Sequence, residues 1–261
     1  MTGTGGRCGA EDLLSFAALR ERDLAREGLV LAEGRLLAER LLAAAGFEPV
    51  GVLCVPALAP RFEALAAGRC PVRVLPEGEL AAVAGYAFHR GVLAAARRPA
   101  SPGLAGILAP AGPRRLVLLP AAADPENLGS VARSAAALGF DGLLLGPESC
   151  DLLSRRASRV SMGAAFTLPS ARLAGPDDLG ALSAAGFSLA AAALGGGDLA
   201  DWRPPARLCL LVGNEYEGLG SEWLPPVVER LGIPMAPGVD SLNAAVAAAL
   251  FMYEAARPRR A

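Results

Sequence analysis

The chain has 261 residues, which is enough for one large domain or two of ordinary size, and its formal net charge is −1. Hydrophobic residues make up 53% and charged residues 20%, an ordinary globular composition that argues against disorder. The near-zero charge excludes a global basic field, so nucleic-acid binding would require positive charge concentrated locally.

The sequence predicts a soluble, cytoplasmic protein without a metal site. No stretch approaches the roughly 18 uninterrupted apolar residues of a membrane span, and acidic residues stand where a signal peptide needs its apolar region. The five cysteines form no C-x-x-C pair and there is one histidine, so we expect no metal and interpret the cysteines as small buried hydrophobes.

Residues 1–100 have the pattern of a small α/β domain. Apolar spacing predicts a helix over residues 11–29, and RLLAERLLAAAG predicts a second helix that ends at Gly46. Three short apolar runs separated by Pro and Gly predict strands over residues 49–55, 71–76 and 91–98.

Residues 101–113 are rich in Pro and Gly, which predicts a linker, and residues 114–261 then alternate short apolar strands with amphipathic helices. This alternation indicates an α/β domain with a mostly parallel sheet covered on both faces. Strands are expected at 116–120, 142–146, 164–169, 187–194, 207–213 and 231–235, with helices from about Ser130, over 177–186, and from about Ser241 to Ala256.

Residues 124–140 are richer in special side chains than packing requires. Asp124, Pro125 and Asn127 favour a turn before the helix that we expect near Ser130. Arg133 then falls early in that helix, where the helix dipole disfavours a cation, so it is either a functional group or a solvated surface arginine.

Residues 208–220 run from a buried strand into a glycine-rich loop that contains Asn214 and Glu215. Ligands of open α/β sheets bind outside the carboxyl ends of the strands, which is the position of this loop. The loop lacks G-x-G-x-x-G, so a dinucleotide site is a weak interpretation.

Residues 231–255 pass through a Pro and Gly loop into a strongly apolar helix. Asp240 and Ser241 both suit the N-cap of that helix, which is the alternative to a role in a site. Asn243, expected inside the first turn, is harder to explain by capping.

Together these segments resemble the three motifs of the SpoU (TrmH) branch of the SPOUT methyltransferases, over roughly residues 113–256. The resemblance is carried by Asn127 with Arg133, by VGNEYEGL, and by IPM followed by DSLNAAVAAAL; RVSMGAAFTLP (159–169) resembles the segment that links them. It implies a C-terminal trefoil-knotted SPOUT domain that uses S-adenosyl-L-methionine to methylate a ribose 2′-hydroxyl in tRNA or rRNA, in a homodimer with its active site near the subunit interface.

The resemblance also implies roles for individual residues. Arg133 would assist deprotonation of the 2′-hydroxyl, by activation and phosphate alignment more than as a literal base, because guanidinium stays protonated. Glu126 departs from the small or neutral residue that is more usual there, and its charge is unfavourable near phosphate. The implied catalytic residues are Asn127, Arg133, Glu215, Ser241 and Asn243, and the implied cofactor-binding residues are Leu211, Val212, Gly213, Ile233, Met235 and Leu242.

Residues 30–42 and 89–99 resemble the SpoU substrate-binding domain, a smaller N-terminal α/β module. For each of its candidate phosphate contacts, solvated surface charge is the alternative. These candidates are Arg35, His89, Arg90, Arg97 and Arg98. Two rival functions stay open: a catalytically inactive SPOUT-fold RNA-binding protein, and an ordinary nucleotide-dependent α/β enzyme.

Overall fold

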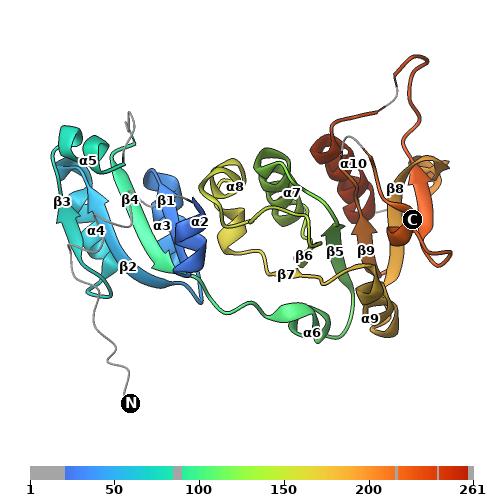
Figure 1. Ribbon diagram of the computed structural model, residues 1–261, viewed down its shortest axis with the longest axis horizontal. Helices are drawn as coiled ribbons and strands as arrows, with labels where there is room; N and C mark the ends of the chain where they lie inside the picture. The colour runs from blue at the N-terminus through green and yellow to red at the C-terminus, as the bar shows by residue number, and fades with distance from the viewer. Residues whose placement is uncertain (1–20, 85–89, 215–216, 240, 258–261) are drawn as a thin grey trace. The chain divides into compact units, whose positions relative to one another are not determined.

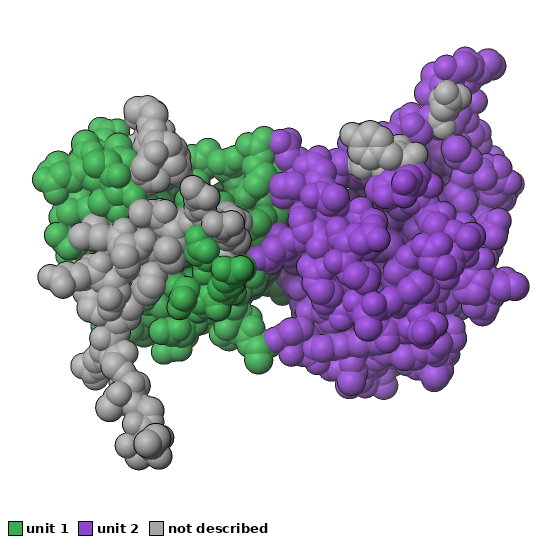
Figure 2. All heavy atoms as spheres, in the orientation of Figure 1, with its two compact units in different colours: residues 1–100, 153–167 green, residues 101–152, 168–261 purple. Residues whose placement is uncertain are grey.

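The computed structural model describes residues 21–84, 90–214, 217–239 and 241–257, and it divides into two compact units (Figure 2). Unit 1 contains residues 1–100 and 153–167, and unit 2 contains residues 101–152 and 168–261. Residues 153–167 therefore differ from the prediction, which assigned them to the C-terminal domain. As a result, the chain passes between the units three times.

Unit 1 is a four-stranded mixed sheet between two helical layers. Its strands are β1 (Leu29–Glu33), β2 (Glu48–Cys54), β3 (Val72–Val74) and β4 (Val92–Arg97), in the order β1-β4-β2-β3, and its helices include α2 (Glu21–Arg26), α3 (Arg35–Ala43), α4 (Ala59–Ala66) and α5 (Glu77–Ala84). One sheet face packs against α3 and α4, and the other against α2 and α5. The expected helix 11–29 lies partly outside the described residues, and its end is wrong because Gly28 (φ 65°) turns the chain into β1.

Residues 153–167 pack onto β1 and α3 of unit 1. They form α8 (Arg155–Val160) and a 3₁₀ turn (Ala164–Phe166), and Phe166 meets Phe47 edge-on with ring centroids 5.7 Å apart. The strand predicted at 164–169 is therefore wrong. Gly163, at φ 82°, turns the chain so that Phe166 enters the core of unit 1, and strand β7 (Ser170–Arg172) starts only afterwards.

Unit 2 confirms the predicted parallel α/β sheet (Figure 1). Its strands are β5 (Arg114–Leu119), β6 (Gly142–Leu145), β7, β8 (Ser188–Asp198), β9 (Arg207–Leu211) and β10 (Glu229–Gly232), all parallel in the order β10-β8-β9-β5-β6-β7. Its helices include α6 (Gly103–Leu108), α7 (Pro125–Ala137), α9 (Leu179–Ala184) and α10 (Ala244–Ala256). Apolar side chains of α6 and α9 share one core with alternate residues of β5, while α7 and α10 pack against each other. No helix in the described ranges is long and apolar enough to cross a bilayer.

The predicted linker 101–113 is instead held against unit 2. Ile107 of α6 is buried in the core, and the guanidinium of Arg207 stacks 4.2 Å from the ring centroid of Phe187. The same guanidinium donates hydrogen bonds of 2.9 to 3.0 Å to the carbonyl oxygens of Leu108, Pro110 and Gly112. Composition alone does not reveal this contact, because the acceptors are backbone carbonyl oxygens, which every residue type has.

Candidate functional site

The start of α7 is fixed by residues of the first predicted segment. Asp124 is its N-cap and accepts a hydrogen bond from the amide of Glu126 at 2.9 Å, and Pro125 occupies the first helical position. The helix thus starts at Pro125 and not near Ser130 as predicted, because an Asp cap followed by Pro is itself a strong start signal. Asn127 therefore lies in the first turn, and Arg133 lies in the third.

The start of α10, in contrast, is later than predicted. Asn243 caps it, with Oδ1 accepting from the amides of Ala245 at 2.9 Å and Val246 at 3.2 Å. Ser241 lies before this cap, and Asp240 lies outside the described residues. The expectation that Asp240 or Ser241 caps the helix, with Asn243 inside it, is therefore wrong for Ser241 and Asn243.

The two helix starts meet through these asparagines. Nδ2 of Asn243 donates a 3.0 Å hydrogen bond to Oδ1 of Asn127. Two of the predicted catalytic residues, Asn127 and Asn243, are thus in contact although they are 116 positions apart in the sequence.

A cavity of about 550 Å³ is lined by Leu242 and Ala244, the neighbours of Asn243, and lies at the carboxyl end of β9 and beside the middle of β8. Carboxyl ends of parallel strands are the usual ligand position in such sheets. The cavity is lined by Ala192, Ala193, Leu194, Val212, Gly213, Asn214, Glu217, Gly218, Leu219, Leu224, Ser241, Leu242, Ala244 and Ala247. A smaller cavity of about 120 Å³ shares several of these residues and adds Ile233 and Met235.

An irregularity between β8 and β10 builds one wall of both cavities. Arg230 pairs with Ala191, but the next residue, Leu231, pairs with Gly197, so residues 192–196 leave the ladder. A Cβ on Gly196 would lie 2.6 Å from the carbonyl carbon of Arg230, so only glycine permits this approach. Sequence reasoning missed this wall, although three consecutive glycines after an apolar strand signal a bulge.

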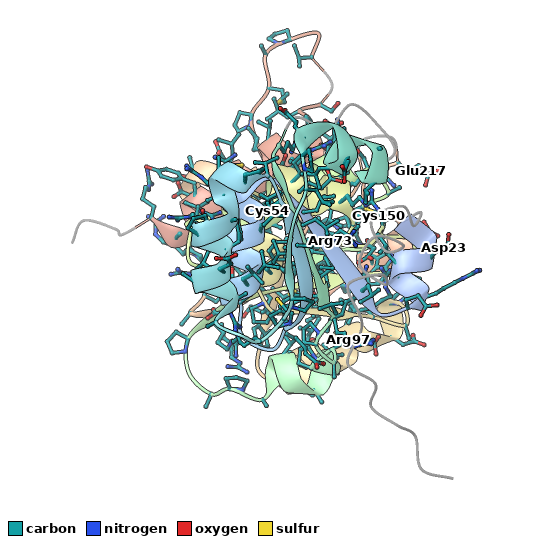
Figure 3. The ribbon with its side chains drawn as sticks, turned by 90° about the vertical axis from the view of Figure 1, so that its left-hand side faces the viewer. Asp23, Cys54, Arg73, Arg97, Cys150 and Glu217 are labelled. Carbon is teal, nitrogen blue, oxygen red and sulfur yellow. The ribbon has the colours of Figure 1, made fainter. Side chains whose placement is uncertain are left out.

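The loop after β9 closes tightly on itself. The amide of Asn214 donates to the carbonyl of Gly218 at 3.2 Å, and the amide of Gly218 donates back at 3.1 Å. A Cβ on Gly213 would lie 2.1 Å from the carbonyl carbon of Gly218. Gly213 is thus required for the closed loop, whose Glu217 is labelled in Figure 3.

The larger cavity suits an adenosine derivative such as S-adenosylmethionine. Its volume lies in the range of roughly 300–1,000 Å³ that is typical of small-molecule sites. Alanine, leucine and glycine dominate its lining, so the cavity can bind the apolar faces of adenine. Backbone groups of the same residues can supply the hydrogen bonds. Carboxylate and amide groups of Glu217 and Asn214 lie at the same wall and can bind hydroxyl groups.

Most predicted cofactor residues line these cavities. Val212, Gly213 and Leu242 line the larger one, and Ile233 and Met235 line the smaller one. Leu211 does not line either; its side chain is fully buried in the core of unit 2. Its position at the end of β9 leaves only its backbone near the loop.

Of the other predicted catalytic residues, the structure describes Ser241 and Arg133. Ser241 lines the larger cavity, whereas Arg133 is exposed on α7 and is absent from the linings given for the two cavities. Six residues separate Arg133 from Asn127, which corresponds to roughly 9 Å along the helix. Glu215 lies outside the described residues.

The predicted RNA-binding arginines fall into two groups in unit 1. Arg90 packs against Gly34, next to Arg35, at the end of the sheet where β4 begins. Arg97 (Figure 3) and Arg98 lie at the other end of β4, roughly 17 Å away by strand rise. Arg98 also has a structural role, because its Nε donates to the carbonyl of Leu29 at 2.8 Å. His89 lies outside the described residues.

Cys150, labelled in Figure 3, lies near the start of α7 but is not suited to nucleophilic chemistry. Burial, together with smaller contributions from Asp151 and Asp124, raises the pKa of its thiol to about 11. The thiol is therefore protonated at neutral pH. The described residues also contain no cluster of three His, Cys, Asp or Glu side chains that could hold a metal.

Comparison with known proteins agrees with this geometry. The model of the SpoU rRNA methylase family matches residues 114–253. An uncharacterized tRNA/rRNA methyltransferase of Mycobacterium bovis is 41% identical over 240 residues, which cover 88% of this chain and 82% of the relative. The 23S rRNA (uridine(2479)-2′-O)-methyltransferase of Streptomyces viridochromogenes is 37% identical over 150 residues, covering 55% of this chain and 52% of the relative.

A solved structure extends the similarity over both units. The crystal structure of the SpoU methyltransferase AviRb from Streptomyces viridochromogenes, in complex with the cofactor AdoMet (S-adenosylmethionine), has a TM-score of 0.77 and 27% identity. The match covers 95% of this chain and 97% of that one. With the family model matching more than half of its length, this chain belongs to the SpoU family of RNA methyltransferases, whose cofactor is S-adenosylmethionine.

Proposed function

We propose that this protein transfers a methyl group from S-adenosylmethionine to a ribose 2′-hydroxyl of tRNA or rRNA. The observation that carries the proposal is the Asn127–Asn243 hydrogen bond, because Leu242 and Ala244 on either side of Asn243 line the apolar cavity. It places polar groups able to bind a ribose beside a cavity able to bind the cofactor. The similarity to the 23S rRNA 2′-O-methyltransferase of Streptomyces viridochromogenes supports the choice of a ribose oxygen.

The bound cofactor would supply an electrophilic methyl group on a sulfonium. Within this chain, Val212, Gly213 and Leu242 form the apolar slot, and Glu217 and Asn214 bind the cofactor's hydroxyl groups. The Asn127–Asn243 pair holds the substrate ribose so that its 2′-oxygen faces the slot. This alignment is the main source of rate enhancement, because positioning two reactants removes much of the entropic barrier.

Arg133 acts on the substrate from the exposed face of α7. Its guanidinium is a permanent cation, so it binds a phosphate next to the target ribose and stabilises the developing alkoxide. The proton of the 2′-hydroxyl leaves to solvent. Glu126, exposed in the first turn of α7, adds a negative charge that repels this phosphate.

The active form is a homodimer of a trefoil-knotted domain. Helix α10 exposes Val246, Leu250 and Tyr253, and large apolar side chains exposed along one helix face are typical of an interface. Because α7 packs against α10, a second copy bound there would lie near Arg133. The exposed Arg35, Arg90 and Arg97 of unit 1 supply phosphate contacts along the rest of the RNA.

The test is methyl transfer by an Arg133→Ala variant. We expect the parent to transfer labelled methyl groups from S-adenosylmethionine to bulk RNA, with the label recovered as 2′-O-methylnucleosides. Arg133→Ala is expected to lose at least about a hundredfold in rate, since it removes a transition-state charge contact, while calorimetry shows unchanged cofactor affinity.

Arg203→Ala serves as the matched control, because Arg203 is also exposed in unit 2 but lies away from the cavity lining. Cofactor binding without methyl transfer by the parent would favour an inactive RNA-binding protein. Label in bases instead of riboses would refute the 2′-hydroxyl as acceptor.

A further inference from the structure

A single arginine holds the loop that follows β6. The guanidinium of Arg172 donates through Nη1 to the carbonyl oxygens of Gly146 at 2.8 Å, Pro147 at 3.3 Å and Ser149 at 2.9 Å. Its Nη2 donates to the carbonyl of Cys150 at 3.3 Å. Arg172 is itself exposed, so these bonds are not needed to satisfy a buried charge. Their consequence is a fixed conformation of residues 146–150.

That loop in turn holds the turn between β5 and α7. The buried hydroxyl of Ser149 donates to the carbonyl of Leu119 at 2.7 Å and accepts from the amide of Ala122 at 3.0 Å. The amide of Cys150 donates to the carbonyl of Ala122 at 2.9 Å. A Cβ on Gly146 would lie 2.2 Å from the carbonyl oxygen of Pro120, so the two backbones are in direct contact.

The braced turn leads directly to the Asn127–Asn243 pair. Asp124 ends the turn as the N-cap of α7, and Asn127 follows in the first helical turn. We propose that Arg172 and Ser149 are positioning residues that fix the start of α7, so that Asn127 meets Asn243 at the rim of the cavity. The effect of these residues on catalysis rests on the proposed function. Their effect on the conformation of the turn between β5 and α7 does not.

Two measurements follow from the placement of these residues. Neither Arg172 nor Ser149 lines the cavity, so Arg172→Ala and Ser149→Ala should leave cofactor affinity within about twofold. Displacement of Asn127 should nevertheless lower kcat roughly ten- to hundredfold, because small errors in alignment are costly. Ser149→Thr keeps the hydroxyl and should restore most of the rate.

Arg207→Ala is the matched control. Arg207 also donates to several backbone carbonyls, but it lies at the amino end of β9, whereas Arg172 lies at the carboxyl end of β7 in the same parallel sheet. We expect Arg207→Ala to lower the melting temperature at least as much as Arg172→Ala, with kcat unchanged. An equal loss of kcat in the two variants would show that the fall in rate follows from a general loss of stability and not from the position of Asn127. That result would overturn the proposal.

Amide hydrogen exchange tests the brace independently of catalysis. Residues 119–127 should exchange faster in Arg172→Ala and Ser149→Ala than in the parent or in Arg207→Ala. In Ser149→Ala the Ala122 amide loses its acceptor, and in Arg172→Ala the loop that carries Ser149 loses the donor that holds it. Unchanged exchange in this segment would refute the brace. A parent that transfers no methyl group to RNA would refute the proposed function and the inferred effect on catalysis, while the exchange result still decides the effect on the conformation of the turn.

Discussion

Asn243 makes three hydrogen bonds with one side chain. Its Oδ1 accepts from two amides of α10, and its Nδ2 donates to Asn127. The amide side chain is suited to this double task because it carries an acceptor and a donor on one planar group. Capping alone would be served as well by serine or aspartate.

This difference allows capping to be separated from the contact with Asn127. We predict that Asn243→Ser keeps the cap and changes the free energy of unfolding by no more than about 0.5 kcal/mol, while methyl transfer falls at least about tenfold because the shorter side chain cannot reach Asn127. Asn243→Ala is the control and should lose about 1 kcal/mol, because the two amides lose their acceptor. Chemical unfolding and methyl transfer are measured in parallel; full activity of Asn243→Ser would remove the asparagine pair from the mechanism.

At the residue scale, the sequence singled out Asn127 and Asn243 but did not predict the hydrogen bond between them. Asn127 and Asn243 were candidates because each stands beside a helix start in a segment with unusual composition. Their hydrogen bond joins positions 116 apart, and such a contact depends on the packing of α7 against α10. Arg172 carried no signal at all, because its partners are carbonyl oxygens that every residue has.

At the scale of elements, the loop after β9 is determined by a close backbone approach. Gly218 lies so close to Gly213 that a side chain at position 213 would force the loop open. We predict that Gly213→Ala weakens S-adenosylmethionine binding at least about tenfold and lowers the free energy of unfolding by about 1–3 kcal/mol, since the added methyl group has to displace backbone. Calorimetric titration and denaturant unfolding measure the two effects.

Gly180→Ala in α9 provides the control for a glycine-to-alanine change. No atom lies within 4 Å of the added methyl group there, and the position is helical. Helix propensity should therefore raise the free energy of unfolding by up to about 1 kcal/mol without affecting cofactor binding. Equal cofactor affinities of the two variants would contradict the role assigned to the closed loop.

Strands β5, β6 and β9 of unit 2 were predicted well because each is a short apolar run that is mostly buried, as expected for a parallel sheet that is covered on both faces. Helix starts were predicted less well. The turn residues Asp124 and Pro125 were assigned to a loop, whereas they cap and begin α7. The irregularity at residues 192–196 was not predicted because the strand was expected to end at Leu194, whereas the glycines that follow allow β8 to continue beside β10 and to form the cavity wall.

At the scale of the whole molecule, chain connectivity was the least predictable feature. Residues 153–167 lie between two strands of unit 2 in sequence but fold with unit 1. Their contacts are specific, since the Glu33 carboxylate lies 3.6 Å from the Arg155 guanidinium and Phe166 enters the core. Composition gives no sign of such a crossing, because an arginine-rich helix looks like a solvated surface helix in isolation.

The assembly of the molecule is the last feature that can be tested. Val246, Leu250 and Tyr253 of α10 are 49%, 42% and 54% exposed, and their spacing places them on one helix face. Leu250→Glu puts a charge in the middle of this face, and burying an unpaired carboxylate in an interface is costly. We predict that the parent sediments as a dimer, whereas Leu250→Glu sediments as a monomer with an unchanged circular dichroism spectrum.

Val227→Glu is the control for the added charge, because Val227 is also exposed but lies in the segment before β10, away from α10. It should remain dimeric. If the active site requires the partner copy, Leu250→Glu should also lose methyl transfer, and raising its concentration should restore part of the rate by mass action. A monomeric parent, or a Leu250→Glu variant that stays dimeric, would show that the exposed face of α10 is not the subunit interface.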